Sequence, residues 1–305
     1  MSAPASNRID VESLMRIRSL ELRARLILEG FLQGLHRSPY HGSSVEFSEY
    51  RAYSPGDDLR HLDWKLMARS DRLCIRKFEA ETNLECRLLV DLSRSMRFGS
   101  GDYTKAEYAA TLAATFAWFL LGQGDAVGMM TFASHILDDL PPSRRKGQLQ
   151  HILAGLVRES APGETDVKKA LDDYLPRARR RCLTVLVSDL LAPIEGLQTQ
   201  FGYLARAGHD VVVYRILDPA ELDFGFSRTA RFEDLETGRI LYLNPATAGP
   251  LYRQRFQEHD EALRALCRRH AIDFLPVRTD ASFFDALYDL LRRRSGIHQK
   301  RKTRA

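Results

Sequence analysis

Three oxygen-bearing side chains follow the first strongly apolar segment of the chain at alternate positions. Asp91, Ser93 and Ser95 come directly after the apolar run 88–90, and a glycine-containing loop follows them. This spacing directs three side chains of one loop toward a single point above the end of a strand. A carboxylate and two hydroxyl groups are hard oxygen ligands, which suit Mg²⁺ or Mn²⁺ in proteins. The loop therefore has the composition of a divalent-cation site, with a simple loop cap by Asp91 as the alternative.

Two further loops carry oxygen ligands beside apolar or helical segments. Ser188 and Asp189 follow a second apolar run, and Thr165 precedes a helical pattern. In doubly wound α/β sheets, ligands bind outside the carboxyl ends of the strands. We therefore expect these oxygen atoms to gather with Asp91 at one edge of a sheet. Magnesium takes few protein carboxylates and keeps several waters, so a set rich in hydroxyl groups suits it.

Short apolar segments alternate with amphipathic segments from Cys86 onward, and these elements must position the loops. The apolar segments predict strands at residues 86–92, 125–133, 182–191, 209–217 and 272–278. The amphipathic segments predict helices at residues 103–124, 148–159, 166–180, 194–208, 249–270 and 282–294, with a hairpin at 229–243. Such alternation is typical of a parallel sheet that helices cover. The predicted fold class is α/β, with a doubly wound, mostly parallel sheet and helices on both faces.

The residues before Cys86 follow other patterns. Apolar residues recur every three or four positions in segment 11–35, which predicts a helix. Segments 44–53 and 73–81 are expected to be strands, with a turn and a short helix at 59–70 between them. The chain is therefore divided into an N-terminal helix and small β segment (1–84), the α/β domain (85–295) and a basic tail (296–305).

The sequence DLSRSM, which begins at Asp91, resembles the D-x-S-x-S motif of the von Willebrand factor type A fold. In that family the motif opens a metal-ion-dependent adhesion site, which a threonine from a second loop and an aspartate from a third loop complete. The resemblance implies a site for Mg²⁺ or Mn²⁺ whose ligands are Asp91, Ser93, Ser95, Thr165 and Asp189. Asp166 and Glu164 remain alternatives to Thr165.

The segment from Gly42 to Glu81 resembles the signature of a bacterial family called domain of unknown function number 58. The matching positions are Gly42, Glu46, Phe47, Arg51, Tyr53, Pro55, Gly56, Asp57, Asp58, Arg60, Asp63, Trp64, Ala68 and Arg69. The family is commonly encoded beside a MoxR-type AAA+ ATPase, so the resemblance implies such an ATPase as a partner. An acidic side chain of the partner would complete the coordination of the ion, and Arg94 and Arg97 would contact the partner beside it. Many members carry two transmembrane helices before this region, where this chain has an amphipathic helix.

Positive charge is concentrated at the end of the chain. The formal net charge is +5, and the residues from Arg292 onward include seven basic side chains and no acid, so residues 1–291 carry −2. This distribution argues against a nucleic-acid surface over the whole domain. The N-terminus lacks the apolar core of a signal peptide, and the uncharged residues between Glu107 and Asp125 predict a buried helix. We therefore expect a cytoplasmic protein with no transmembrane segment and no specific nucleic-acid partner.

Sequence motifs of several enzyme classes are absent. A haloacid-dehalogenase phosphatase needs a second acid two residues after its first aspartate, where this chain has Ser93. Neither the G-x-S-x-G motif of serine hydrolases nor the phosphate-binding motif G-x-x-x-x-G-K-[ST] occurs. The expected function is a metal-dependent protein–protein interaction module, an adaptor that works with the ATPase in a chaperone-like or complex-assembly role. The alternative is a magnesium-dependent hydrolase of unknown substrate.

Overall fold

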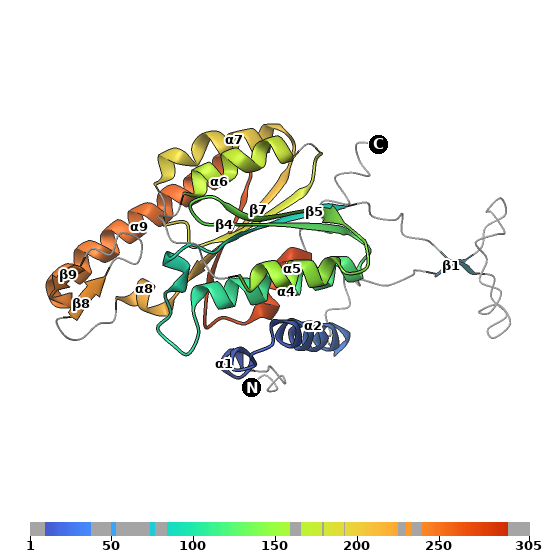
Figure 1. The fold of residues 1–305 in the computed structure, drawn as a ribbon, viewed down its shortest axis with the longest axis horizontal. Coiled ribbons are helices and arrows are strands. Elements are labelled where there is room, and N and C mark those ends of the chain that lie inside the picture. The colour runs from blue at the N-terminus through green and yellow to red at the C-terminus, as the bar shows by residue number, and fades with distance from the viewer. Residues whose placement is uncertain are drawn as a thin grey trace. The chain divides into compact units, whose positions relative to one another are not determined.

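A six-stranded sheet forms the centre of the larger of two units in the chain (Figure 1). The computed structural model describes residues 10–37, 50–52, 74–76, 84–158, 166–178, 180–191, 193–224, 230–233 and 240–291. The larger unit comprises Met1–Leu32 together with Leu84–Ala305, and the smaller comprises Gln33–Asn83. In the smaller unit, strand β1 (Tyr50–Ala52) pairs antiparallel with β2 (Cys74–Arg76). The short helix predicted at residues 59–70 lies outside the described residues.

The strand order of the main sheet is β10–β7–β6–β3–β4–β5. The strands are β3 (Glu85–Asp91), β4 (Ala126–Phe132), β5 (Ile136–Ser143), β6 (Leu183–Ser188), β7 (Asp210–Leu217) and β10 (Asp273–Arg278). All neighbouring pairs are parallel except β4 with β5. Val90 of β3 is in register with Val187 of β6. The next residues, Asp91 and Ser188, therefore end their strands side by side at one edge of the sheet.

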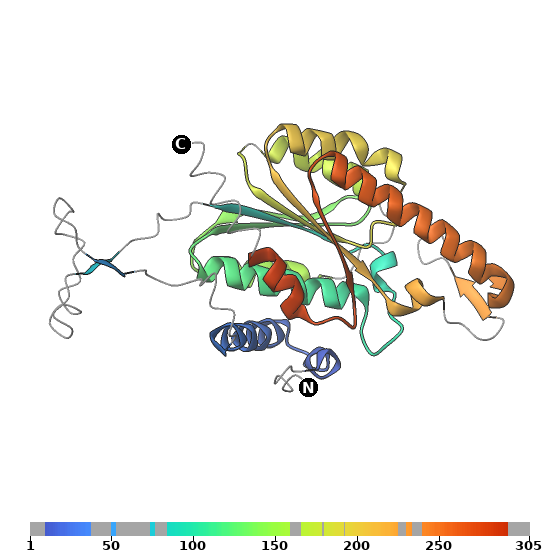
Figure 2. The ribbon, with the colours of Figure 1, turned by 180° about the vertical axis from the view of Figure 1, so that it is seen from behind.

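Helices cover both faces of this sheet, which confirms the predicted α/β class (Figures 1 and 2). On one face lie α4 (Lys105–Gly122), α5 (Gln148–Leu156) and a helix at residues 283–291. On the other lie α6 (Val167–Tyr174), α7 (Gln198–Arg206) and α9 (Pro245–Arg269). Leu171, Phe201 and Leu263 of these last three helices share one buried cluster with sheet residues. Burial of this kind is the main stabilising term of such a fold.

Helix α4 contains the long uncharged segment, and the structure buries most of it against the sheet as predicted. Tyr108 of α4 stacks on Phe283 with ring centroids 4.3 Å apart, and Phe116 contacts Tyr214 of β7 at 5.0 Å. The apolar character of α4 therefore serves the core of the domain. Within the described residues, no helix has both the length and the apolar composition needed to cross a membrane.

The predicted N-terminal helix is two helices, α1 (Val11–Met15) and α2 (Leu20–Arg37). Helix α1 and the part of α2 up to Leu32 belong to the larger unit. The Thr111 hydroxyl of α4 points at the sulfur of Met15 at 3.8 Å, and the rings of Phe31 and Phe284 lie 6.0 Å apart. A Cβ atom on Gly30 would approach the Phe284 ring to 3.2 Å, so this glycine permits the close contact. Within the described residues, segment 10–32 thus belongs with the α/β body.

Two elements of the larger unit were not predicted. Strand β5 carries Pro141 and Pro142, which an edge strand tolerates because one side of its backbone forms no ladder. Helix α8 (Pro219–Asp223) begins directly after β7, where Asp218 and Glu221 form a capping box. The predicted hairpin is confirmed as β8 (Ala230–Glu233) with β9 (Ile240–Leu243). Short 3₁₀ turns occupy η2 (Ser95–Arg97), η3 (Leu175–Arg177) and η4 (Ile194–Gly196).

Candidate functional site

The first loop after β3 brings its oxygen atoms together around a buried carboxylate. Asp91 is fully buried, and its Oδ1 accepts a hydrogen bond from the backbone N–H of Ser93 at 2.9 Å. The hydroxyl oxygens of Ser93 and Ser95 lie 3.1 Å apart. From the neighbouring strand β6, the hydroxyl of Ser188 donates to Asp91 Oδ2 at 2.6 Å. These four side chains thus meet at the carboxyl edge of the sheet, where the alternation of strands and helices places them.

The electrostatics of Asp91 favour a bound cation. Burial, reinforced by the charge of Asp189, raises the pKa of Asp91 to about 7, while hydrogen bonds from Ser188 and Ser93 oppose the rise. No described Lys, Arg or His side chain forms an ion pair with this carboxylate. A buried carboxylate without a cationic neighbour, flanked by two hydroxyl groups, suits an oxygen-seeking ion such as Mg²⁺. The side chains of Asp91, Ser93 and Ser95 therefore fit a divalent cation such as Mg²⁺.

Asp189 belongs to the same edge but is already bound to a cation of the chain. Its Oδ2 accepts from the Lys105 ammonium group at 2.8 Å, and its Oδ1 accepts from the backbone N–H of Leu191 at 3.3 Å. The Asp189 carbonyl accepts from Arg215 Nε at 3.0 Å. Asp189, a predicted ligand of the ion, is therefore already paired with a lysine.

The backbone of this third loop is held in an unusual conformation. Leu190 is fully buried with φ at 49°, in the left-handed region that side chains other than glycine rarely adopt. Its N–H donates to Ser188 Oγ at 3.0 Å, and its carbonyl lies 2.7 Å from His259 Nε2 of α9. Hydrogen bonds on both sides of Leu190 therefore stabilise the turn that presents Asp189.

Lys105 and Glu221 are the residues that sequence reasoning missed. Lys105 is the first residue of α4 and is fully buried, and its ammonium group also donates to Glu221 of α8 at 2.6 Å. Burial lowers the pKa of Lys105, but Asp189 and Glu221 outweigh that effect and raise it overall. Burial raises the pKa of Glu221, against the opposing charge of Lys105. The available signal was a lysine in the first turn of a helix that is almost entirely buried.

The second loop is only partly within the described residues. Thr165 lies outside them, so its role stays a prediction. Asp166, its alternative, is exposed and caps α6, where its Oδ1 accepts from the N–H of Lys169 at 2.8 Å. The N–H of Asp166 donates to the carbonyl of Ala133 at 3.2 Å, just beyond β4. The loop therefore ends at the same edge of the sheet.

The predicted partner contacts lie beside the first loop. Arg94 precedes η2 and is half-buried, while Arg97 ends η2 and is exposed.

Among the described residues, no group of three or more His, Cys, Asp or Glu side chains could hold a metal ion. The ion site at Asp91, Ser93, Ser95, Thr165 and Asp189 therefore stays a prediction.

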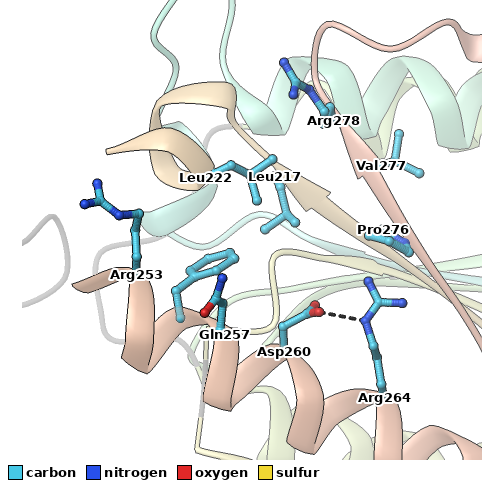
Figure 3. Close-up of a pocket in the computed structure, with 10 residues that line it drawn as sticks. Leu217, Leu222, Arg253, Gln257, Asp260, Arg264, Pro276, Val277 and Arg278 are labelled. Atoms are coloured by element: carbon cyan, nitrogen blue, oxygen red, sulfur yellow. Dashed lines mark hydrogen bonds and ion pairs between the residues drawn. The ribbon is translucent and has the colours of Figure 1, made fainter. Parts of the chain in front are cut away.

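A cavity of about 420 Å³ lies farther along the same edge of the sheet (Figure 3). It is lined by Leu217, Leu222, Arg253, Phe256, Gln257, Asp260, Arg264, Pro276, Val277 and Arg278. Leu217 and Arg278 are the last residues of β7 and β10, so the cavity opens beside the carboxyl ends of those strands. Its floor is apolar, and its lining carries more arginines than acids.

The single carboxylate of the cavity is shared by two arginines. Asp260 accepts from Arg264 Nε at 2.6 Å and from Arg215 Nη1 at 2.8 Å. In the described part of the chain, Arg253 has no ion-pair partner and is exposed. Arg215 is fully buried and lies over the Phe256 ring at 5.0 Å. The cavity therefore presents a positive rim over an apolar floor.

Comparisons with known proteins identify the relatives of the chain. The family model described as "Protein of unknown function DUF58" matches residues 49–266. Uncharacterized proteins of Mycobacterium bovis and Mycobacterium tuberculosis are each 30% identical over 282 residues, which cover 90% of this chain and 87% of theirs. Two solved structures are similar in fold. BatB from Bacteroides thetaiotaomicron has a TM-score of 0.48 at 15% identity, over 70% of this chain and 99% of that one. The VWA domain of SpRpn10 has a TM-score of 0.40 at 12% identity, over 67% and 93%. The family model covers most of the chain, which therefore belongs to the DUF58 family.

Proposed function

We propose that this protein is a metal-dependent protein-interaction module that binds an acidic partner through a divalent cation held at Asp91, Ser93 and Ser95. One observation carries the proposal. Asp91 is a fully buried carboxylate that lacks a cationic partner among the described residues and lies beside two hydroxyl groups. Burying an unpaired charge is costly. A bound Mg²⁺ or Mn²⁺ would remove that cost.

The ligands available at this edge leave the ion open to a further group. The serine hydroxyls are neutral, and Asp189 is shared with Lys105. An ion bound by few protein charges keeps waters in its remaining positions. A glutamate or aspartate of another protein can displace one of these waters. Arg94 and Arg97 would contact the same partner beside the ion.

The arginine-lined cavity supports an acidic partner on the same edge. The site lies at the ends of β3 and β6 and the cavity at the ends of β7 and β10, which are consecutive strands of the sheet. Arg264 is bonded to Asp260 and Arg278 to Asp280, whereas Arg253 has no ion-pair partner among the described residues and can offer bidentate donors to a carboxylate. An acidic segment could therefore reach the ion with one carboxylate and Arg253 with another. The resemblance of the sequence to families encoded beside MoxR-type ATPases makes such an ATPase the proposed partner.

Divalent-ion binding can be tested by calorimetric titration with Mn²⁺. Wild type should bind, and Asp91→Asn should lose measurable binding because the central carboxylate is gone. Asp102→Asn is a matched control, since Asp102 is an exposed carboxylate of a nearby loop. Equal affinity in wild type and Asp91→Asn would refute the ion site.

Partner binding forms the second part of the test. The MoxR-type ATPase encoded by the same organism should co-purify with wild type in Mg²⁺ and separate from it when a chelator is added. The variant Ser93→Ala with Ser95→Ala should behave like chelated wild type while keeping its circular dichroism spectrum. Binding that persists in a folded, metal-free variant would contradict the proposal. Turnover of phosphoester substrates in Mg²⁺ would instead favour the hydrolase alternative.

A further inference from the structure

Lys105 occupies a position that is unfavourable for a lysine. It is fully buried at the first turn of α4, where the helix dipole presents its positive end. Taking an ammonium group out of water is also costly unless it is well paired. Thr104 already caps the helix by accepting from the N–H of Glu107, so α4 does not need Lys105 to begin. The position of Lys105 therefore calls for an explanation beyond the helix itself.

Two carboxylates from distant segments surround the ammonium group. Asp189 Oδ2 lies at 2.8 Å and Glu221 Oε1 at 2.6 Å, and the three side chains are almost completely shielded from water. Glu221 is fixed in turn, because its Oε2 accepts from the N–H of Asp218 at 3.1 Å. Lys105 thus joins α4, the loop after β6 and α8 in one ion-paired group.

This group divides the carboxylates of the edge into two kinds. Asp189 has a donor on each oxygen, one of them a cation, whereas Asp91 is bonded only to neutral groups. A divalent ion that binds at Asp91 would meet a neighbouring acid whose charge is already compensated. It would also meet the repulsion of the nearby ammonium group, which is only weakly screened in a buried site.

We propose that Lys105 is a built-in counter-ion of the third loop, which holds Asp189 away from full ligation and thereby weakens the affinity of the site for divalent cations. This inference rests on the proposed ion site and specifies how its affinity is set. A weakly held ion exchanges readily, so the partner's carboxylate becomes a substantial part of the coordination. Lys105 is a positioning residue in this scheme.

Two substitutions should shift the affinity in opposite directions. Lys105→Met removes a positive charge and frees Asp189, so Mn²⁺ should bind about tenfold tighter or more. Glu221→Gln leaves the ammonium group to Asp189 alone and removes a nearby negative charge. Mn²⁺ should then bind several-fold more weakly than to wild type.

Lys105→Met leaves the buried carboxylates of Asp189 and Glu221 facing each other, which could prevent folding. A second variant is therefore needed. The double variant Lys105→Met with Glu221→Gln removes one positive and one negative charge and keeps the net charge of wild type. The double variant should bind Mn²⁺ more tightly than Glu221→Gln, because Asp189 is free of Lys105 in the double variant but still paired with it in Glu221→Gln. Thermal melting with and without Mn²⁺ provides a second readout, since Mn²⁺ raises the melting temperature more in a variant that binds it more tightly.

Calorimetric titration of the full chain with Mn²⁺ tests whether Lys105 weakens the affinity of the site. The inference is supported when Lys105→Met, or the double variant relative to Glu221→Gln, binds tighter by the stated factor. Equal or weaker binding in both comparisons would overturn it and make Lys105 a structural residue or an aid to ligation. Failure of the ion site itself has a different signature, in which Asp91→Asn binds like wild type or no variant binds Mn²⁺ at all. Binding by Lys105→Met alone, with none in wild type, would support the inference in its strongest form.

Discussion

Replacing Asp91 by asparagine should stabilise the metal-free protein, although it removes the central group of the candidate site. The reason is the buried charge, which raises the pKa of Asp91 from 3.8 to about 7. Between these two values the folded protein binds a proton that the unfolded chain does not, so its stability falls as the pH rises through this window. Above pH 7 the whole penalty is present.

The size of the effect follows from the pKa difference. Each unit corresponds to about 1.4 kcal/mol, so the penalty on the free energy of unfolding is about 4 kcal/mol at pH 8 and about 2 kcal/mol at pH 5. Asparagine has nearly the same shape and carries no charge, so the variant should avoid this penalty, less the cost of its altered hydrogen bonds with Ser188 and Ser93. The advantage of the variant should therefore shrink by about 2.6 kcal/mol from pH 8 to pH 5.

Chemical denaturation of both proteins in a chelator, at a series of pH values, measures this difference. Adding Mn²⁺ should reverse the order, because the ion stabilises only the protein that binds it. Asp102→Asn should follow wild type throughout. A variant that is less stable than wild type at every pH in the chelator, with a constant difference, would refute the reasoning about the unpaired charge.

Three further predictions concern the rim, the loop and the tail. Ser95→Ala should weaken Mn²⁺ binding in calorimetry with little change in melting temperature, because Ser95 is only half-buried; an unchanged affinity for Mn²⁺ would contradict its assignment as a ligand. Arg253→Glu should weaken binding of an acidic partner, most clearly at low salt, while leaving Mn²⁺ affinity unchanged; an unchanged partner affinity would remove the cavity from the interface. A chain that ends at Ser295 should keep the melting temperature of the full chain in calorimetric scans, since Ile297 is the only large aliphatic side chain among the deleted residues; a drop of several degrees would show that the tail docks.

Most of the sheet could be predicted because its strands are buried on both faces. The runs in β3, β6 and β7 are almost continuously apolar, so their pattern differs clearly from that of the intervening helices. Strand β5 was missed because it is an edge strand with two acids and two prolines, which interrupt both apolar runs and alternation. The break between α1 and α2 was missed because apolar spacing continues across it.

The candidate site was predictable to the extent that it follows from strand ends. Asp91 and Asp189 each follow an apolar run, and parallel pairing of β3 with β6 places both at one edge. The ion pairs of Lys105 were not predictable, because its partners are 84 and 116 positions away in the sequence. No local sequence pattern indicates an ion pair between residues so far apart in the sequence. The same holds for Arg215, whose partner Asp260 lies 45 residues later on another element.

The prolines at the two outer strands of the sheet bear on how this protein can associate with others. Strand β5 has Pro141 and Pro142, and β10, at the opposite side, has Pro276. Proline has no backbone N–H, so neither outer strand offers a complete ladder to an incoming strand. Extension of the sheet by a second molecule, the usual route to fibrils and to runaway self-assembly, is therefore disfavoured at both sides. This arrangement protects the fold from polymerising and leaves the carboxyl edge of the strands as the surface for the proposed recognition of a partner.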